Sequence, residues 1–234
     1  MDRAKEERLA NSLKDPKKDN SSIPKLIDDT IRHGNKIYLM TDWHLWVRNK
    51  KNHPECHKCK SFNQIFENIN NTLKPDDLLI YLGDLVDGEF ENKEELKTAL
   101  KNITFKKILV RGNNDLFPPQ FYKSCGFEDV VDSFVWHDII FSHIPLKNKN
   151  EMNIHGHLHG YGIYWIPYRN HIDVASLKGR IKPVELKDVI KHISKYKKTI
   201  KEDPSHFDEG YTMSVSGNIF EECMNSCTHV DDPF

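Results

Sequence analysis

Aspartate and histidine side chains recur at short spacings along this chain, beginning with Asp42 and His44 on either side of Trp43. On an extended backbone, alternate side chains point to the same side, so Asp42 and His44 could bind one metal ion while Trp43 points away. Carboxylates and imidazoles are common protein ligands of divalent transition metals. The pair therefore predicts a metal-chelating position.

Four later segments carry side chains of the same kinds, and glycines flank several of them. Glycine permits the sharp backbone turns that would bring such segments to one point. Two aspartates, one asparagine and four histidines make up the candidate ligand set: Asp42, His44, Asp84, Asn113, His143, His157 and His159. This set is too large for one tetrahedral zinc ion. It suits two ions that share a carboxylate and keep positions for water or substrate.

The elements predicted around these segments would place them at one edge of a sheet. Apolar runs over residues 37–40, 78–82 and 108–110 predict buried strands, and polar groups follow each run closely. Helical apolar patterns over residues 62–73 and 96–103 separate these strands, which indicates parallel pairing in an α/β layered fold. Because the carboxyl ends of parallel strands meet at one edge, the polar groups are expected to converge there.

The remaining apolar segments predict further strands and one more helix. Residues 130–142 indicate two strands joined by a tight turn at His137 and Asp138. A helix is expected to begin near Pro183, since proline is well tolerated in a first helical turn. Two more strands are expected over residues 152–155 and 171–174.

Composition divides the chain into three parts. Residues 1–35 are mostly charged and polar, and Pro16 and Pro24 are expected to interrupt any helix there. This segment is interpreted as an arm laid over the domain or partly disordered. One domain is expected over residues 36–198, and residues 199–234 form a polar C-terminal extension.

Overall composition limits the partners and the compartment. With 234 residues, of which 38% are hydrophobic, the chain can bury a full core. Its formal net charge of -1 provides no overall field for a polyanion, so nucleic acid is not expected as an obligate partner. The sequence shows neither a signal peptide nor an apolar run of membrane-spanning length. A cytoplasmic protein without a membrane partner is therefore expected.

The five polar blocks, taken in order, resemble those of the calcineurin-like metallophosphoesterase superfamily. That superfamily has DxH, GDxxD, GN followed by histidine and an acid, a lone histidine, and GHxH, and the match covers roughly residues 36–192. The resemblance implies an α/β/β/α fold, a layered β-sandwich with flanking helices, and a binuclear metal site at the carboxyl ends of strands. It implies one metal bound by Asp42, His44 and His159, a second bound by Asn113, His143 and His157, and Asp84 bridging both.

The activity implied by the resemblance is hydrolysis of phosphate monoesters or diesters by a hydroxide that bridges two divalent metal ions. The implied substrates are phosphorylated small molecules or nucleotides. The resemblance favours manganese, and the mixed donor set also permits iron, zinc, cobalt or nickel. Two alternatives stay open: a binding scaffold with weak or no activity, and a protein phosphatase. Scaffolds of this kind typically lose ligands, so the complete ligand set favours an enzyme.

Asp84, Asn114 and Asp87 are the candidate catalytic residues. Many relatives have at position 114 a histidine that approaches the leaving group, and this chain has Asn114, which cannot act as an acid. Asp87 is expected either to orient a ligand histidine or to cap a turn. His155 lies in phase with His157 and is expected to be a packed or hydrogen-bonded histidine.

Two weaker sets of residues complete the candidates. Basic side chains near the blocks could clamp a phosphate or belong to the solvated surface: Arg48, Arg111, Lys147 and Lys178. Four cysteines, of which the first two lie beside His53 and His57, are either reduced thiols or the ligands of one structural zinc: Cys56, Cys59, Cys223 and Cys227.

Overall fold

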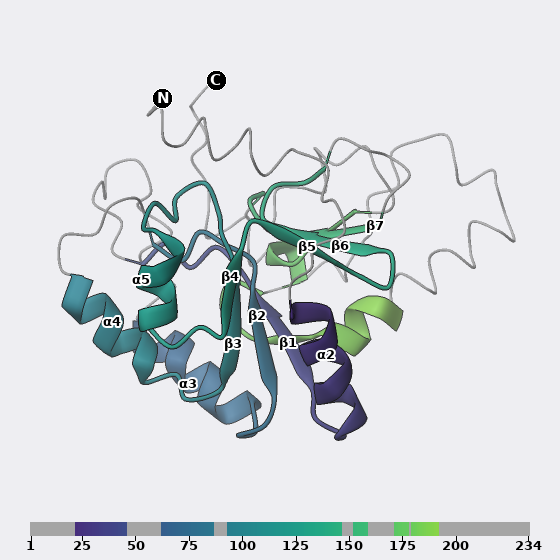
Figure 1. Cartoon of the computed structure of the whole chain (residues 1–234), viewed down its shortest axis with the longest axis horizontal. Helices are drawn as coiled ribbons and strands as arrows, with labels where there is room; N and C mark the ends of the chain where they lie inside the picture. The colour runs from purple at the N-terminus through teal and green to yellow at the C-terminus, as the bar shows by residue number, and fades with distance from the viewer. Residues whose placement is uncertain are drawn as a thin grey trace, which may run out of the picture.

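The computed structural model describes residues 22–45, 62–86, 93–146, 152–158, 171–177 and 179–191. These residues form two mixed β-sheets flanked by helices (Figure 1). The five-stranded sheet has the order β4-β3-β2-β1-β9, and the four-stranded sheet has the order β5-β6-β7-β8. The predicted fold class, α/β with layered sheets, is confirmed.

The five-stranded sheet holds the strands that the apolar runs predict. Its members are β1 (Ile37–Met40), β2 (Leu78–Tyr81), β3 (Lys106–Val110), β4 (Asp129–Val131) and β9 (Val184–Glu185). Strands β1 to β4 pair in parallel, as expected for strands separated by helices, and β9 is antiparallel to β1. Their carboxyl ends therefore lie along one edge of the sheet.

The four-stranded sheet corrects the prediction for residues 130–142. Its members are β5 (Ser133–Trp136), β6 (Ile139–Ser142), β7 (Met152–His155) and β8 (His171–Asp173). The tight turn at His137 and Asp138 is present, with φ angles of 47° and 62°. The segment nevertheless contributes three strands, because the chain leaves β4 in the first sheet and passes through Asp132 into β5 of the second.

Three helices cover one face of the five-stranded sheet: α3 (Phe62–Thr72), α4 (Lys93–Lys101) and α5 (Pro119–Ser124). Ile65 and Ile69 of α3 pack with Leu96 of α4 in a core that also includes Met40 and Tyr81 of the sheet. Within the described parts of the chain, no helix is both long enough and apolar enough to cross a bilayer.

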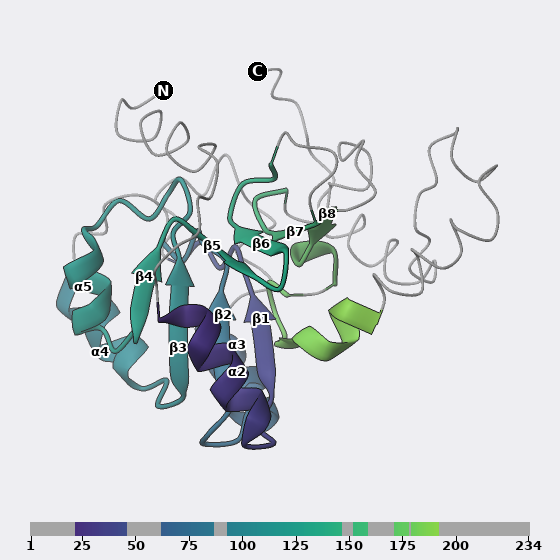
Figure 2. The same ribbon diagram turned by 45° about the vertical axis from the view of Figure 1, so that its right-hand side comes forward.

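Helix α2 (Ile23–Arg32) lies on the opposite face of that sheet, in front of it in Figure 2. Its Ile23 and Ile27 are fully buried in a second core, shared by both sheets. The interpretation of residues 1–35 as an arm without a helix is therefore wrong for this part. Pro24 lies in the first turn of α2, where its missing N–H leaves no hydrogen bond unmade.

The helix expected near Pro183 begins slightly later in the chain. Residues 184–185 first form the edge strand β9, and helical residues 186–191 follow directly. Leu186 and Val189 of this helical segment are buried in the second core. Between β8 and β9, a short 3₁₀ helix, η2 (Ala175–Leu177), lies close in sequence to Gly179 and Arg180.

Candidate metal centre

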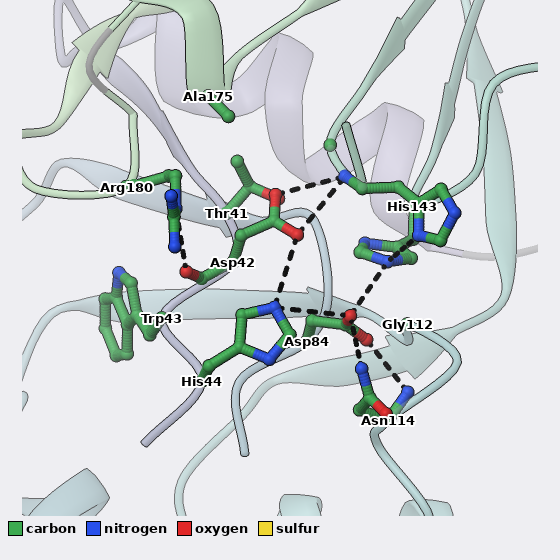
Figure 3. Close-up of polar contacts among 12 residues, drawn as sticks. Thr41, Asp42, Trp43, His44, Asp84, Gly112, Asn114, His143, Ala175 and Arg180 are labelled. Carbon is green, nitrogen blue, oxygen red and sulfur yellow. Dashed lines mark hydrogen bonds and ion pairs between the residues drawn. The ribbon is translucent and has the colours of Figure 1, made fainter. Parts of the chain in front are cut away.

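Polar side chains from both sheets converge at the carboxyl ends of the strands, as the sequence predicts (Figure 3). Asp42 follows β1, Asp84 follows β2 and Asn113 follows β3. From the second sheet, His143 follows β6 and His157 follows β7. The site therefore lies at the junction of the two sheets.

The backbone that presents these ligands is not extended, which corrects the expectation for Asp42 and His44. Asp42 has a φ of 53°, His44 of 46°, Asp84 of 56° and His157 of 73°, all in the left-handed region. Residues other than glycine adopt this conformation at a cost in strain, and such strain concentrates at functional sites. Trp43 still points away from Asp42, and its ring packs 4.5 Å from the ring of Tyr81.

The first cluster consists of Asp42, His44 and Asp84, whose potential ligand atoms all lie within 4.8 Å of one another. Nε2 of His44 is 3.8 Å from Oδ1 of Asp42 and 3.5 Å from Oδ2 of Asp84. The Thr41 hydroxyl and the His157 backbone N–H donate to Oδ2 of Asp42 at 2.7 and 3.0 Å. These donors orient the carboxylate with Oδ1 toward His44.

The second cluster consists of Asp84, His143 and His157, again within 4.8 Å. Nε2 of His143 lies 3.3 Å from Oδ2 of Asp84, 3.1 Å from Oδ1 of Asn113 and 3.2 Å from Nδ1 of His157. The other ring nitrogen, Nδ1, donates to the Leu82 carbonyl at 2.7 Å. That bond fixes the ring so that Nε2 faces the cluster.

Asp84 belongs to both clusters, and Asn114 holds its carboxylate. The backbone N–H of Asn114 donates to Oδ1 of Asp84 at 2.8 Å, and the side-chain Nδ2 donates to Oδ2 at 2.7 Å (Figure 3). Both residues are buried, with 1% of Asp84 and 8% of Asn114 exposed. The shared carboxylate is therefore fixed from the side of the loop that follows β3.

Buried charge dominates the electrostatics of the site. Burial disfavours the imidazolium form of His143, but the negative charges of Asp84 and Asp42 outweigh burial and raise the pKa of His143 to about 10. Burial likewise opposes ionisation of Asp84, yet His143 holds the pKa of Asp84 below its usual value. Burial and the charge of His143 lower the pKa of His157 to about 4. Without metal, a proton on His143 supplies the positive charge between the carboxylates.

These features fit divalent cations. Asp42 and Asp84 are buried carboxylates, and the nitrogen atoms that face them come from imidazoles, which bind metals in their neutral form. A buried carboxylate is stable when a cation compensates its charge. The donor set of carboxylate, imidazole and amide oxygen suits divalent cations.

Asp115 is a residue of the site to which the sequence analysis gives no role. Its fully buried carboxylate accepts the backbone N–H groups of Asp84 and Gly112 on Oδ2, at 2.9 and 2.8 Å, and that of Leu85 on Oδ1 at 2.9 Å. Burial and the charge of Asp84 raise the pKa of Asp115 to about 6. Asp115 therefore ties the loop after β2 to the loop after β3. The acid position of the GN block was the signal that could have indicated it.

Two glycines allow this close approach of the loops. Gly83 has a φ of 86°, a conformation that favours glycine. Gly112 is required for space, since a Cβ at that position would overlap the backbone and the carboxylate of Asp84. The glycines predicted from sequence to turn the chain thus also make room for the shared ligand.

The other candidate residues lie as follows. Arg111 forms an ion pair of 2.6 Å with Asp132 and is not part of either cluster. Arg180, which the sequence analysis overlooks, donates from Nε to the backbone carbonyl of Asp42 at 3.3 Å. His155 is buried and hydrogen-bonded through Nδ1 to the Gly156 carbonyl, as expected. Nine candidates fall outside the described residues: Arg48, Cys56, Cys59, Asp87, Lys147, His159, Lys178, Cys223 and Cys227.

Comparison with known proteins gives a matching family, one similar sequence and solved structures with limited similarity. The model of the calcineurin-like phosphoesterase family matches residues 35–221. An uncharacterized protein of Methanocaldococcus jannaschii is 27% identical over 173 residues, which cover 69% of this chain and 93% of that protein. A protein of unknown function from Aquifex aeolicus has a solved structure with 24% identity and a TM-score of 0.49, covering 67% of this chain and 98% of that one. The solved structure of the nuclease MPE of Pseudomonas putida has 20% identity and a TM-score of 0.41, covering 54% of this chain and 62% of that one.

Proposed function

The chain belongs to the calcineurin-like phosphoesterase family, and from this premise we propose that it hydrolyses phosphate esters at the two clusters around Asp84. The observation that carries the proposal is that two groups of potential metal ligands share one buried carboxylate. Sites with two metal ions use this arrangement to act on both the attacking and the leaving oxygen of a phosphate ester.

The proposed ligands divide between two metal ions. Asp42 and His44 would hold one ion, Asn113, His143 and His157 would hold the other, and Asp84 would contact both. His159 is proposed as a further ligand of the first ion. Bound divalent cations lower the pKa of water and neutralise phosphoryl oxygens as charge develops. We propose manganese as the physiological metal, with iron, zinc, cobalt and nickel as alternatives.

The residues around the ligands prepare the site for this chemistry. The bond from His143 to the Leu82 carbonyl fixes the imidazole, and Asp115 fixes the backbone that carries Asp84. Asn114 offers N–H donors but no titratable proton. A positioned general acid contributes about 10² to 10⁴ in rate, so esters with good leaving groups are the favoured substrates. Among esters with good leaving groups, we propose phosphorylated small molecules or nucleotides as the substrates.

The proposal is tested by assaying a generic aryl phosphomonoester and a generic aryl phosphodiester with each candidate metal in turn. Wild-type protein should bind two equivalents of metal and hydrolyse at least one ester. Asp84→Ala should lose metal-dependent turnover, because both ions lose a ligand. The exposed Asp188 provides a matched control, and Asp188→Ala should keep full activity.

Two results would contradict the proposal. Wild-type turnover with two bound metals in Asp84→Ala would remove Asp84 from the site. Two bound metals in the wild type without hydrolysis of either ester would favour a metal-binding scaffold instead.

A further inference from the structure

The side chains of Asn114, His44 and His143 face one oxygen atom of Asp84. Nδ2 of Asn114 lies 2.7 Å from Oδ2 of Asp84. The same Oδ2 is 3.5 Å from Nε2 of His44 and 3.3 Å from Nε2 of His143, which belong to different clusters. The other oxygen, Oδ1, accepts the backbone N–H of Asn114.

The chemistry of the two groups fixes the direction of this bond. An ionised carboxylate only accepts hydrogen bonds, so the carboxamide must turn its NH₂ group toward Oδ2. Both residues are buried, since Asp84 is 1% exposed and Asn114 is 8% exposed. Water therefore cannot easily replace the Asn114 carboxamide as the donor to Oδ2. The carboxamide therefore stabilises the carboxylate in the metal-free protein.

A carboxylate oxygen has two lone-pair positions. A cation on the His44 side and another on the His143 side would use both positions of Oδ2, and none would be left for Nδ2 of Asn114. A single cation would leave one position, and the hydrogen bond could persist. The backbone bond to Oδ1 would be unaffected in either state.

We propose that two metal ions displace the side chain of Asn114 from Asp84, so that the carboxamide and the second cation compete for Oδ2. This inference rests on the proposed function, because it assumes that Asp84 is shared by two cations. The loop itself does not move, since Asp115 and the Asn114 backbone N–H hold it. The released carboxamide remains beside the site as a neutral donor of hydrogen bonds.

Competition has a measurable consequence for metal affinity. Removal of the carboxamide removes the competitor of the second cation. A hydrogen bond to a charged group is strong enough for its loss to change an equilibrium about tenfold. Asn114→Ala should therefore bind the second Mn²⁺ about tenfold more tightly than the wild type.

Calorimetric titration of the full chain with Mn²⁺ tests this expectation. The matched control is Asn102→Ala, which removes an exposed carboxamide at the end of α4 and should leave both affinities unchanged. Unchanged or weaker binding of the second Mn²⁺ by Asn114→Ala would overturn the inference. A wild-type chain that binds neither Mn²⁺ nor any of the alternative metals, iron, zinc, cobalt and nickel, would instead overturn the proposed function, so the two failures are distinguishable.

A second measurement uses the wild-type chain and does not depend on how the variant folds. The side-chain NH₂ resonances of Asn114, assigned by their loss in Asn114→Ala, can be followed by ¹⁵N NMR during titration with diamagnetic Zn²⁺. If the carboxamide is displaced, these resonances should keep the chemical shift of a hydrogen-bonded NH₂ group after one equivalent of Zn²⁺. They should lose it after the second equivalent. Retention of that shift with two equivalents bound would overturn the inference.

Discussion

Protein N–H and O–H groups hold the carboxylates of Asp42 and Asp84 in place, and one oxygen of each lies 3.3 to 3.8 Å from a histidine Nε2. In Asp42, Oδ2 accepts the Thr41 hydroxyl and the His157 backbone N–H. In Asp84, Oδ1 accepts the backbone N–H of Asn114. Two buried carboxylates oriented in this way need positive charge beside them, and His143 supplies it when no metal is bound.

Metal binding should release a proton from His143. With a pKa of about 10, His143 is protonated at pH 7.5 in the metal-free protein, and a metal ligand must be deprotonated. The enthalpy of metal binding should therefore depend on the ionisation enthalpy of the buffer, with about one proton released. Calorimetry in two buffers at pH 7.5 measures this number. A value of zero would show that His143 is already neutral.

The same pKa shift predicts how the stability of the metal-free protein depends on pH. The pKa of His143 is about 10 in the folded state, above the ordinary imidazole value of 6.5, so it is raised on folding. Its contribution to stability is then full below pH 6.5 and is lost as pH rises through 10. In denaturant titrations, wild-type stability should fall across this range, and His143→Gln should show a smaller fall. An equal fall of stability with pH in the two proteins would contradict the raised pKa of His143.

The residues of the two clusters belong to blocks that the sequence analysis groups together, and the residues that support them were harder to predict. Asp42, Asp84 and His143 belong to short blocks whose spacing indicates metal binding. Asp115 accepts three backbone N–H groups, and a partner of that kind depends on tertiary contacts that spacing does not reveal. Arg180 lies far from the first block in sequence, and it reaches Asp42 only through the fold.

At the scale of elements, the site depends on the close contact of the loops after β2 and β3. Gly112→Ala should disrupt it, because the added Cβ would overlap the backbone and carboxylate of Asp84. Overpacking of a buried site costs about 1–3 kcal/mol, and displacement of the shared ligand should weaken both metal affinities by tenfold or more, about 1.4 kcal/mol each.

Gly126→Ala is the matched control for this prediction. Gly126 has a φ of 91°, and a Cβ there would meet the flexible end of Lys107, away from the ligands. This variant should lose stability but keep its metal affinities. Metal titration and thermal unfolding of both variants separate the two effects. Normal metal binding by Gly112→Ala would contradict the role assigned to the loop contact.

Strands β1 and β2 and helices α3 and α4 were predictable from their apolar patterns, whereas strand β9 and the change of sheet after β4 were not. Strands β1 and β2 are buried along their whole length, and β3 begins with Lys106 and Lys107 before its buried apolar residues 108–110. Strand β9 has two residues, and the boundary between β4 and β5 is a change of sheet at Asp132 within one apolar segment. Such changes depend on which partner strand is available, and this is decided by the whole fold.

At the scale of the whole molecule, the five-stranded sheet separates two cores, and the second core includes α2. That core extends from Ile23 and Ile27 of α2, past the five-stranded sheet, to Phe141 and Ile154 of the second sheet. Helix α2 escaped prediction because Pro24 predicts an interruption of any helix in this segment, whereas in the structure Pro24 lies in the first turn. Ile23, Leu26 and Ile27 recur at helical spacing, and tertiary packing stabilises the helix.

Substitutions at two isoleucines of α2 test whether this helix is part of the domain. Ile27 is fully buried, so Ile27→Ala should lower the free energy of unfolding by about 2–5 kcal/mol. Ile31, which is 48% exposed, is the matched control, and Ile31→Ala should have little effect. Denaturant titration of both variants measures the difference. Equal stabilities would mean that α2 is a detachable arm.

Anomalous diffraction from crystals grown with Mn²⁺ would show whether two metal ions share the carboxylate of Asp84. We predict two anomalous peaks at the junction of the two sheets, one beside Asp42 and His44 and one beside His143 and His157, with the carboxylate of Asp84 in contact with both. A single peak, or two peaks of which neither contacts Asp84, would contradict the account.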